Sequence, residues 1–266
     1  MSLRIGINDS PEKTEFLTSE NCIGDSTYRC DDGLFYHIRE DRQTVVVMCA
    51  DDVRNTLEHA EIAYEVVIDG KTYPVTTVVS NAFQGCGALK KVTLSSNLRV
   101  IESFAFSRSA ISEAIIPHGC KIHNRIFEGC KHLKKVVLPD DLIEIPYQSF
   151  RDCSLETIDL PEGLQNIGFC AFQNTQLTEI TLPSSLTLID EGVFDGCDKL
   201  SNVYSKITNP AACKVKSFEL PANSVFAAGK EFYSQATLHV PNDKGLVSAY
   251  KKKVVWKKFS NIVADL

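Results

Sequence analysis

The stretch IFEGCKHLKKVVLPDDLIEI, residues 126–145, decides the fold because its pattern recurs at a fixed step along the chain. The step is 22 residues, and the short apolar runs end in turn at Ser95, Pro117, Pro139, Pro161 and Pro183. The apolar residue just before each of these, and the one two places earlier, keep the same step: Leu94, Ile116, Leu138, Leu160 and Leu182, with Val92, Ala114, Val136, Ile158 and Ile180. A step this regular predicts a row of similar structural units.

An aromatic residue also marks each unit, with a spacing that drifts between 21 and 23 residues: Phe83, Phe106, Phe127, Phe150, Phe172 and Phe194. A small residue follows three places later, at Cys86, Ser109, Cys130, Cys153, Thr175 and Cys197. Each unit reads as turn, short strand and turn, and has too few apolar residues to enclose its own core. Stacking would cover the apolar columns and place adjacent parallel strands about 4.8 Å apart.

The pattern AFxxCxxLxxVxLPxxLxxI, which residues 126–145 follow closely, resembles the BspA-like leucine-rich repeats of bacterial surface and secreted proteins. The flank ATLHVPNDKGLVSAYKKKVVWKKFSNIV, residues 236–263, is similar to the strand and basic helix that end many members of this family. The resemblance implies a β-rich leucine-rich-repeat solenoid with a parallel sheet on one face and a short or irregular convex side. It also implies a β N-terminal cap and a strand-plus-helix C-terminal cap.

The chain divides into four segments around these repeats, which occupy residues 75–205. Residues 1–24 are polar and predicted to be partly disordered. Residues 25–74 are predicted to form the β cap, because DGLFYHI and TVVVMCA alternate like paired strands and Asp69-Gly70 separates two strand-like runs. Between these strands, ADDVRNTLEHAEIA predicts a helix that starts at Asp51 or Asp52.

Residues 206–266 are predicted to hold a degenerate repeat and the C-terminal cap. ITNPAAC and FELPAN lose the repeat pattern, ATLHVP predicts a strand, and Gly245 to Lys253 predicts a short helix. Trp256, Phe259 and Ile262 are expected to seal the last coil. The lysines at 251–253 and 257–258 are interpreted as a solvated face of this cap, since no aromatic stacking platform accompanies them.

The bulk composition excludes several classes of function for this sequence. The formal net charge is -6, so no general basic excess is present to neutralise phosphates, and nucleic acid is not an expected partner. No run approaches the roughly 20 apolar residues of a membrane helix, so no transmembrane segment is expected. Met1 to Glu20 lacks a secretory signal pattern, which leaves a cytosolic protein or a signal removed beforehand as the alternatives.

The residues that could carry chemistry follow the repeat instead of forming a site. The repeat cysteines lie where a small buried side chain is needed, and Ser109 and Thr175 take the same place, which favours packing over metal binding. Cys130 and Cys153 should lie in neighbouring coils, so a disulfide between them stays open. His118, Cys120 and His123 group in one turn but are interpreted as an irregular repeat. We expect no catalytic centre, no cofactor and no metal, and hence no enzyme.

A partner is expected on the exposed face of the sheet, because inward-pointing Val92 and Leu94 send Lys91 and Thr93 outward. The predicted surface consists of two columns of outward residues: Thr93, Ile115, Val137, Asp159, Thr181 and Tyr204, beside Lys91, Glu113, Lys135, Thr157, Glu179 and Asn202. Alternating charges such as Lys91, Glu113 and Lys135 are expected mainly to neutralise one another. Adjacent apolar residues at Ile115 and Val137 are harder to explain without a partner.

The family resemblance implies a non-enzymatic protein-interaction or adhesion module at the bacterial cell surface, or secreted, with a host matrix or cell-surface protein as ligand. The first alternative is a glycan-binding accessory protein at the cell surface, which would need aromatic platforms where the predicted face offers only Tyr204. The second is a cytoplasmic scaffold, which fits the ten cysteines and the missing signal pattern.

Overall fold

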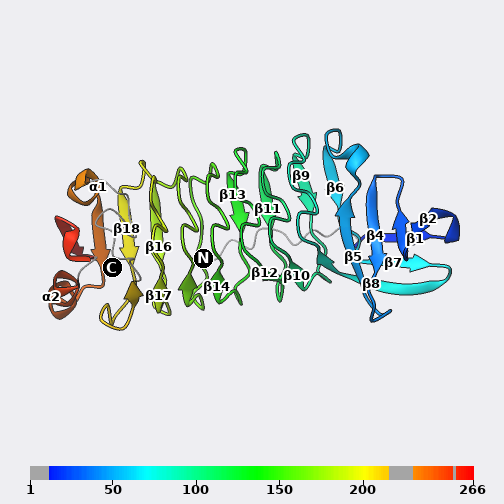
Figure 1. The fold of residues 1–266 in the computed structure, drawn as a ribbon. Helices are drawn as coiled ribbons and strands as arrows, with labels where there is room; N and C mark the ends of the chain where they lie inside the picture. Colours follow the sequence, from blue (N-terminus) through cyan, green and yellow to red (C-terminus); the bar gives the residue numbers. More distant parts are fainter. Residues whose placement is uncertain (1–11, 216–229, 254–255) are drawn as a thin grey trace.

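The computed structural model describes residues 12–215, 230–253 and 256–266. Its coils follow one another in an elongated row, with a larger sheet at the N-terminal end and two short helices at the C-terminal end (Figure 1). Each coil contributes one short segment to each of the two sides of the row. Residues 22 apart in sequence therefore lie side by side on neighbouring coils. The stacked architecture that the repeat predicts is therefore present.

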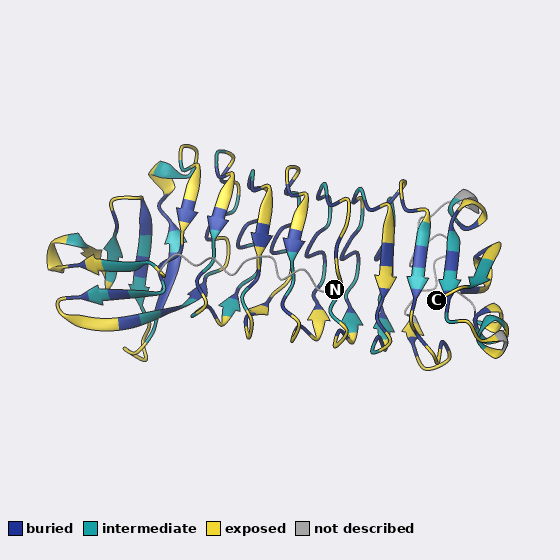
Figure 2. Cartoon of the chain, turned by 180° about the vertical axis from the view of Figure 1, so that it is seen from behind, coloured by how far each residue is buried: buried dark blue, intermediate teal, exposed yellow. Residues whose placement is uncertain are grey.

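One side of the row carries short parallel strands whose middle residues point into the core. They are β6 (His59–Glu61), β9 (Lys91–Thr93), β11 (Glu113–Ile115) and β13 (Lys135–Val137) in one sheet, and β16 (Glu179–Leu182), β18 (Asn202–Ser205), β20 (Thr237–Val240) and β21 (Asn261–Ala264) in another. Val92, Ala114 and Val136 are buried while both of their neighbours in each strand are more exposed. Figure 2 shows this two-residue alternation as buried bands across exposed strands.

The prediction of a single parallel sheet is wrong, because the opposite side of the coils also carries hydrogen-bonded parallel strands. Its strands are the end of β8 (Lys71–Val78), β10 (Val100–Ile101) and β12 (Lys121–Ile122), followed by β14 (Glu144–Ile145), β15 (Asn166–Ile167), β17 (Leu188–Ile189) and β19 (Lys214–Val215). Two residues are too few to show an alternating pattern, so these segments were predicted as turns.

The exposed face is also interrupted, since residues 153–161 contain no strand. Ile158 is still buried in this coil, so the side-chain pattern continues where the strand pairing stops. Periodicity reports which side chains face the core, but it does not report backbone hydrogen bonds. Thr157 and Asp159 consequently lie outside both sheets, between β13 and β16.

The Phe column forms the third continuous element of the stack. Neighbouring rings, from Phe83 to Phe194, are stacked with centroids 5.2 to 5.8 Å apart, and each Phe is at most 1% exposed. The turns that carry the rings are tied coil to coil, for example by Phe106 N–H to Ile126 O at 2.9 Å. Two residues after the ring the backbone is left-handed, which Gly129 adopts at a φ of 75° without the penalty that a side chain brings.

The N-terminal sheet is mixed, and its hairpins lie where the sequence predicted strands. β4 (Leu34–Ile38) pairs antiparallel with β5 (Val45–Cys49), and β7 (Glu65–Ile68) pairs antiparallel with β8. Asp69 and Gly70 join β7 to β8 with positive φ at both positions, as a two-residue type I′ turn requires. β5 and β8 run parallel, which attaches this sheet to the first coil.

The structure of residues 12–74 bears on two expectations for the N-terminal region. The stretch up to residue 24, predicted to be partly disordered, forms β1 (Thr14–Leu17), the 3-10 turn η1 (Ser19–Asn21) and β2 (Cys22–Gly24), which pairs with β3 (Thr27–Arg29). β1 is held by pairing with β7, a long-range partner that composition does not reveal. Residues 1–11 lie outside the described residues. The helix predicted from Asp51 or Asp52 is one 3-10 turn, η2 (Asp51–Val53), because the chain then pairs with β9 as β6.

The C-terminal region contains α1 (Lys230–Gln235), α2 (Lys244–Lys252) and the 3-10 turn η3 (Trp256–Lys258). The predicted helix from Gly245 to Lys253 is thus present one residue earlier, and Asp243 caps it by accepting a hydrogen bond from Gly245 N–H at 2.7 Å. Trp256 and Phe259 are buried and Ile262 is half-buried. FELPAN lies outside the described residues. In the described part of the chain, no helix has the length and apolar character needed to cross a membrane.

Candidate interaction face

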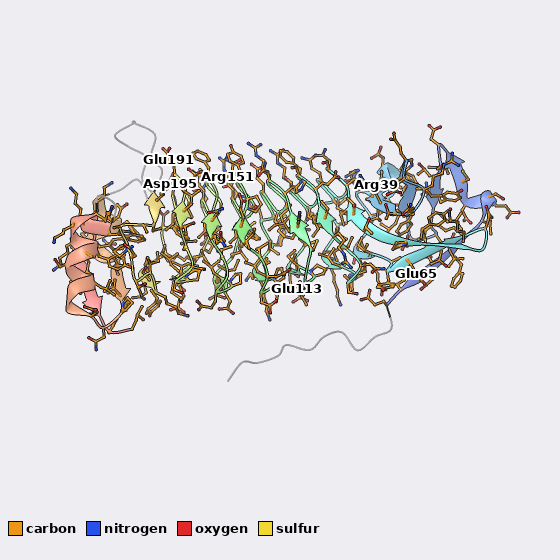
Figure 3. All side chains as sticks on the ribbon, turned by 90° about the horizontal axis from the view of Figure 1, so that it is seen from below. Arg39, Glu65, Glu113, Arg151, Glu191 and Asp195 are labelled. Atoms are coloured by element: carbon orange, nitrogen blue, oxygen red, sulfur yellow. The ribbon has the colours of Figure 1, made fainter. Side chains whose placement is uncertain are left out.

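The outward side chains of the short strands form two columns, which we call the outer face. Its members are the first and third residues of β6, β9, β11, β13, β16, β18, β20 and β21. Ile115 is the direct partner of Val137, and Thr181 is the direct partner of Tyr204. Glu113 lies between Lys91 and Lys135, so charges of opposite sign alternate along the other column. In Figure 3, Glu113 projects on the side of the stack opposite to Arg151 and Asp195, which belong to the Phe turns.

The outer face is longer at both ends than the sequence predicted. At the N-terminal end, His59 and Glu61 of β6 pair with Lys91 and Thr93. The sequence contains a pattern that indicates β6, because His59-Ala60-Glu61 has the polar–apolar–polar order of β9. The weak helical pattern of the surrounding residues led to the prediction of a helix instead. At the C-terminal end, Thr237 pairs with Asn202 and His239 with Tyr204.

The predicted positions in the interrupted coil do not join this arrangement. Thr157 and Asp159 are exposed, as the sequence predicted, but they belong to residues 153–161 and so to neither sheet. Glu179 and Asn202 face each other in the second sheet. Of the twelve predicted residues, six therefore form a first group before this coil, two lie within it, and four form a second group after it.

An apolar centre with charged surroundings occupies the first group. Ile115 is 56% exposed and the adjacent Val137 is half-buried, with no element over them in the described structure. Ion pairs run alongside, from Lys90 to Glu58 at 3.1 Å and from Lys134 to Glu156 at 3.7 Å. Exposed pairs of this kind contribute about 0 to 1 kcal/mol each. An apolar centre within a polar rim is the usual anatomy of a protein-binding surface.

An aromatic cluster occupies the second group. The rings of Tyr204 and His239 are stacked with centroids 4.4 Å apart. His239 Nδ1 lies 2.9 Å from an Asp265 carboxylate oxygen, and Nε2 lies 3.3 Å from Asn202 Oδ1. Both rings are thus fixed before any ligand arrives, which lowers the entropy that binding would cost.

The repeat cysteines form hydrogen bonds between coils, whereas the sequence predicted only that they pack in the core. The thiols of Cys130, Cys153 and Cys197 donate to the backbone carbonyls of Phe106, Phe127 and Phe172, in each case in the preceding coil, at 3.0 to 3.1 Å. Burial raises the pKa of Cys130 and of Cys197 to about 11, and it raises the pKa of Cys153 as well. A thiol that holds its proton is a poor nucleophile and a poor metal ligand.

We expect these thiols to resist modification in the folded chain. Near pH 8, a thiol reagent should modify the exposed Cys22 first and should leave Cys130 and Cys153 intact until the protein unfolds. The measurement is native-state alkylation followed by peptide mass spectrometry. Labelling of Cys130 as fast as that of Cys22 would contradict the buried, protonated state.

The histidine of the irregular turn has different neighbours from those predicted. His118 Nδ1 lies 3.1 Å from Asp140 and 3.2 Å from Asp141, on the next coil, whereas the sequence grouped His118 with Cys120 and His123. Asp141 also accepts a hydrogen bond from Gly119 N–H at 3.0 Å. His118 and Asp140 are 75% and 94% exposed, and the contact between their side chains links two adjacent turns.

Stacked 22-residue coils with short parallel strands and an internal Phe column define a leucine-rich-repeat solenoid. The chain belongs to the family described as BspA type leucine rich repeat region, whose model matches six copies over residues 71–142 and 120–239.

Among similar solved structures, a leucine-rich repeat protein of T. pallidum is 28% identical, with a TM-score of 0.42 over 66% of this chain and 70% of that one. One from Bacteroides ovatus is 17% identical, with a TM-score of 0.42 over 79% and 70%. A leucine rich cell surface protein of Faecalibacterium prausnitzii is 16% identical, with a TM-score of 0.36 over 90% and 95%. No curated protein matches the chain.

Proposed function

We propose that this chain is a non-enzymatic binding module of the bacterial cell surface, and that it holds a protein partner on its outer face. The observation that carries the proposal is an apolar pair on the outer face, the exposed Ile115 beside the half-buried Val137 on the neighbouring strand. Isolated exposed apolar residues are common, but an adjacent pair on a rigid sheet offers a preformed contact. The surface location rests on the family alone.

A glycan ligand is the second candidate, because the structure adds an aromatic neighbour to Tyr204. The Tyr204–His239 stack is surrounded by polar groups of Asn202 and Asp265, which could bond to hydroxyl groups. The rings stack on one another, however, so less of each ring face is left for a sugar. For this reason a protein ligand is favoured.

The test is binding of the purified chain to arrays of extracellular-matrix proteins and of glycans, with Val137→Asp tested alongside. We expect a protein hit whose affinity falls about tenfold or more in Val137→Asp, because a loss of about 1.4 kcal/mol changes affinity tenfold. Circular dichroism checks that the variant is folded. Unchanged binding of a folded Val137→Asp would refute the outer face, and a hit on glycans alone would favour the second candidate.

A further inference from the structure

Two cysteines lie where the N-terminal sheet meets the first coil. Cys49 ends β5, and Cys86 closes the turn that carries Phe83. The backbones are tied together, because Cys49 N–H donates to Ala82 O at 3.1 Å. Both side chains are buried, with 3% of Cys49 and none of Cys86 exposed. The two thiols therefore lie in the buried boundary between the N-terminal sheet and the first coil.

The side chains of this pair lie close enough to interact. The Cys49 thiol also lies 3.3 Å from Ala50 O, to which it donates. The later repeat cysteines differ, since Cys130 and Cys153 donate to the Phe carbonyl of the preceding coil. Cys86 belongs to the first Phe turn, before which no Phe of the column exists, and a second thiol is its partner instead.

A cation lies next to one sulfur of the pair. Arg54 Nη1 is 3.9 Å from Cys86 Sγ, and the same atom donates to Gln84 O at 2.7 Å. Asp51 holds the guanidinium from its other side at 3.2 Å. Because the Arg54 side chain is 27% exposed, the Cys86 sulfur lies only one side chain below the solvent.

The environment makes the two thiols chemically unequal. The hydrogen bond from Cys49 and the charge of Arg54 lower the pKa of Cys86, against the effect of burial. Donating that hydrogen bond, together with burial, raises the pKa of Cys49. One sulfur is thus suited to attack and the other to keep its proton until a later step, as in reactive dithiols.

We propose that Cys49 and Cys86 form an oxidisable pair that a small hydroperoxide converts into a disulfide joining the N-terminal sheet to the first coil. Cys86 sulfur attacks one peroxide oxygen, the O–O bond breaks, and the leaving oxygen takes up a proton to become water. The Cys86 sulfenic acid is then attacked by Cys49 sulfur, the S–O bond breaks, and the Cys49 proton leaves with a second water. In total, two thiols and one hydrogen peroxide give one disulfide and two waters.

The bond would close the chain between residues 49 and 86 and so restrict the unfolded state at this end. The oxidised chain should therefore unfold at a higher denaturant midpoint than the reduced chain. The stabilisation should be confined to the N-terminal sheet and the first coil, because repeats transmit order mainly to their neighbours.

The experiment treats the reduced full chain with hydrogen peroxide, blocks remaining thiols under denaturing conditions and digests the product with trypsin without reduction. We expect a linked pair of peptides, residues 43–54 and 72–90, to form before any other cross-link. Arg54→Gln should slow formation of the Cys49–Cys86 link several-fold near neutral pH, because the Cys86 thiolate loses its cation. This variant also loses the cleavage site after residue 54, so its linked peptides are residues 43–71 and 72–90. Cys130 and Cys153 serve as the control pair. They also lie in adjacent coils, but their thiols donate to backbone carbonyls.

Recovery of Cys49 and Cys86 as blocked thiols, while Cys22 is oxidised, would overturn the proposal. So would a Cys130–Cys153 cross-link that forms equally fast, because proximity of coils alone would then explain the result. An unchanged rate in Arg54→Gln would remove the assigned role of the cation. The main readout uses the unmodified sequence, so it does not depend on how well a cysteine variant folds.

Discussion

Replacing Phe127 with alanine is expected to lower the free energy of unfolding by about 3 to 5 kcal/mol, the usual cost of removing a buried aromatic ring. Phe127 is fully buried and stacks between Phe106 and Phe150, with centroid distances of 5.6 and 5.8 Å. The change leaves a cavity in the middle of the column, where neither neighbouring coil can collapse without breaking its turn hydrogen bonds. Urea denaturation followed by circular dichroism and by the fluorescence of Trp256 measures the loss.

Phe16→Ala is the matched control, because it makes the same chemical change at a side chain that is 76% exposed. Surface substitutions of this kind usually shift stability by about 0.5 kcal/mol or less. Equal losses from Phe127→Ala and Phe16→Ala would mean that the Phe column is not the core of the stack.

Gly168→Ala is the second change with a large expected effect, a destabilisation of about 1 to 3 kcal/mol from overpacking. Gly168 follows β15 and donates its N–H to Ile145 O in the preceding coil at 2.8 Å. An added Cβ would lie 2.8 Å from Tyr147 N and 3.0 Å from Pro146 C. Both are backbone atoms, which cannot rotate away as a flexible side chain can, so the two coils must separate.

Gly163→Ala provides the control for this prediction, five residues earlier in the same coil. Its added Cβ would meet nothing closer than Asp140 O at 3.7 Å, an ordinary contact. The change should be neutral or stabilising by up to about 1 kcal/mol, because alanine restricts the unfolded chain. Thermal unfolding of both variants measures the difference, and a Gly168→Ala protein as stable as Gly163→Ala would contradict the close approach of the coils.

The stacking of the repeats could be predicted from sequence because it depends on side-chain burial, which a 22-residue step reports directly. Val92, Ala114 and Val136 are buried as their spacing predicted, and the Phe column is continuous. The backbone pairing could not be predicted in the same way. Ile158 keeps the apolar pattern in a coil without a strand, and Ile101 and Ile145 belong to strands too short to show a period.

The candidate site was predictable in its centre and not at its ends. Ile115 and Val137 face outward because they flank buried residues in a period of two, which needs no tertiary information. His59 and His239 join the outer face only through pairing with strands distant in sequence. The contact of Cys49 with Cys86 was equally hidden, because it depends on how β5 meets the first turn.

The most direct test of the proposed outer face compares two equal changes on opposite sides of the stack. Ile143, beside β14, is 61% exposed, and Ile115 on β11 is 56% exposed. With the protein partner found on the arrays, Ile115→Asp should weaken binding about tenfold or more, while Ile143→Asp leaves the affinity unchanged. Equal affinities for both folded variants, or a loss in Ile143→Asp alone, would contradict the assignment of the binding surface.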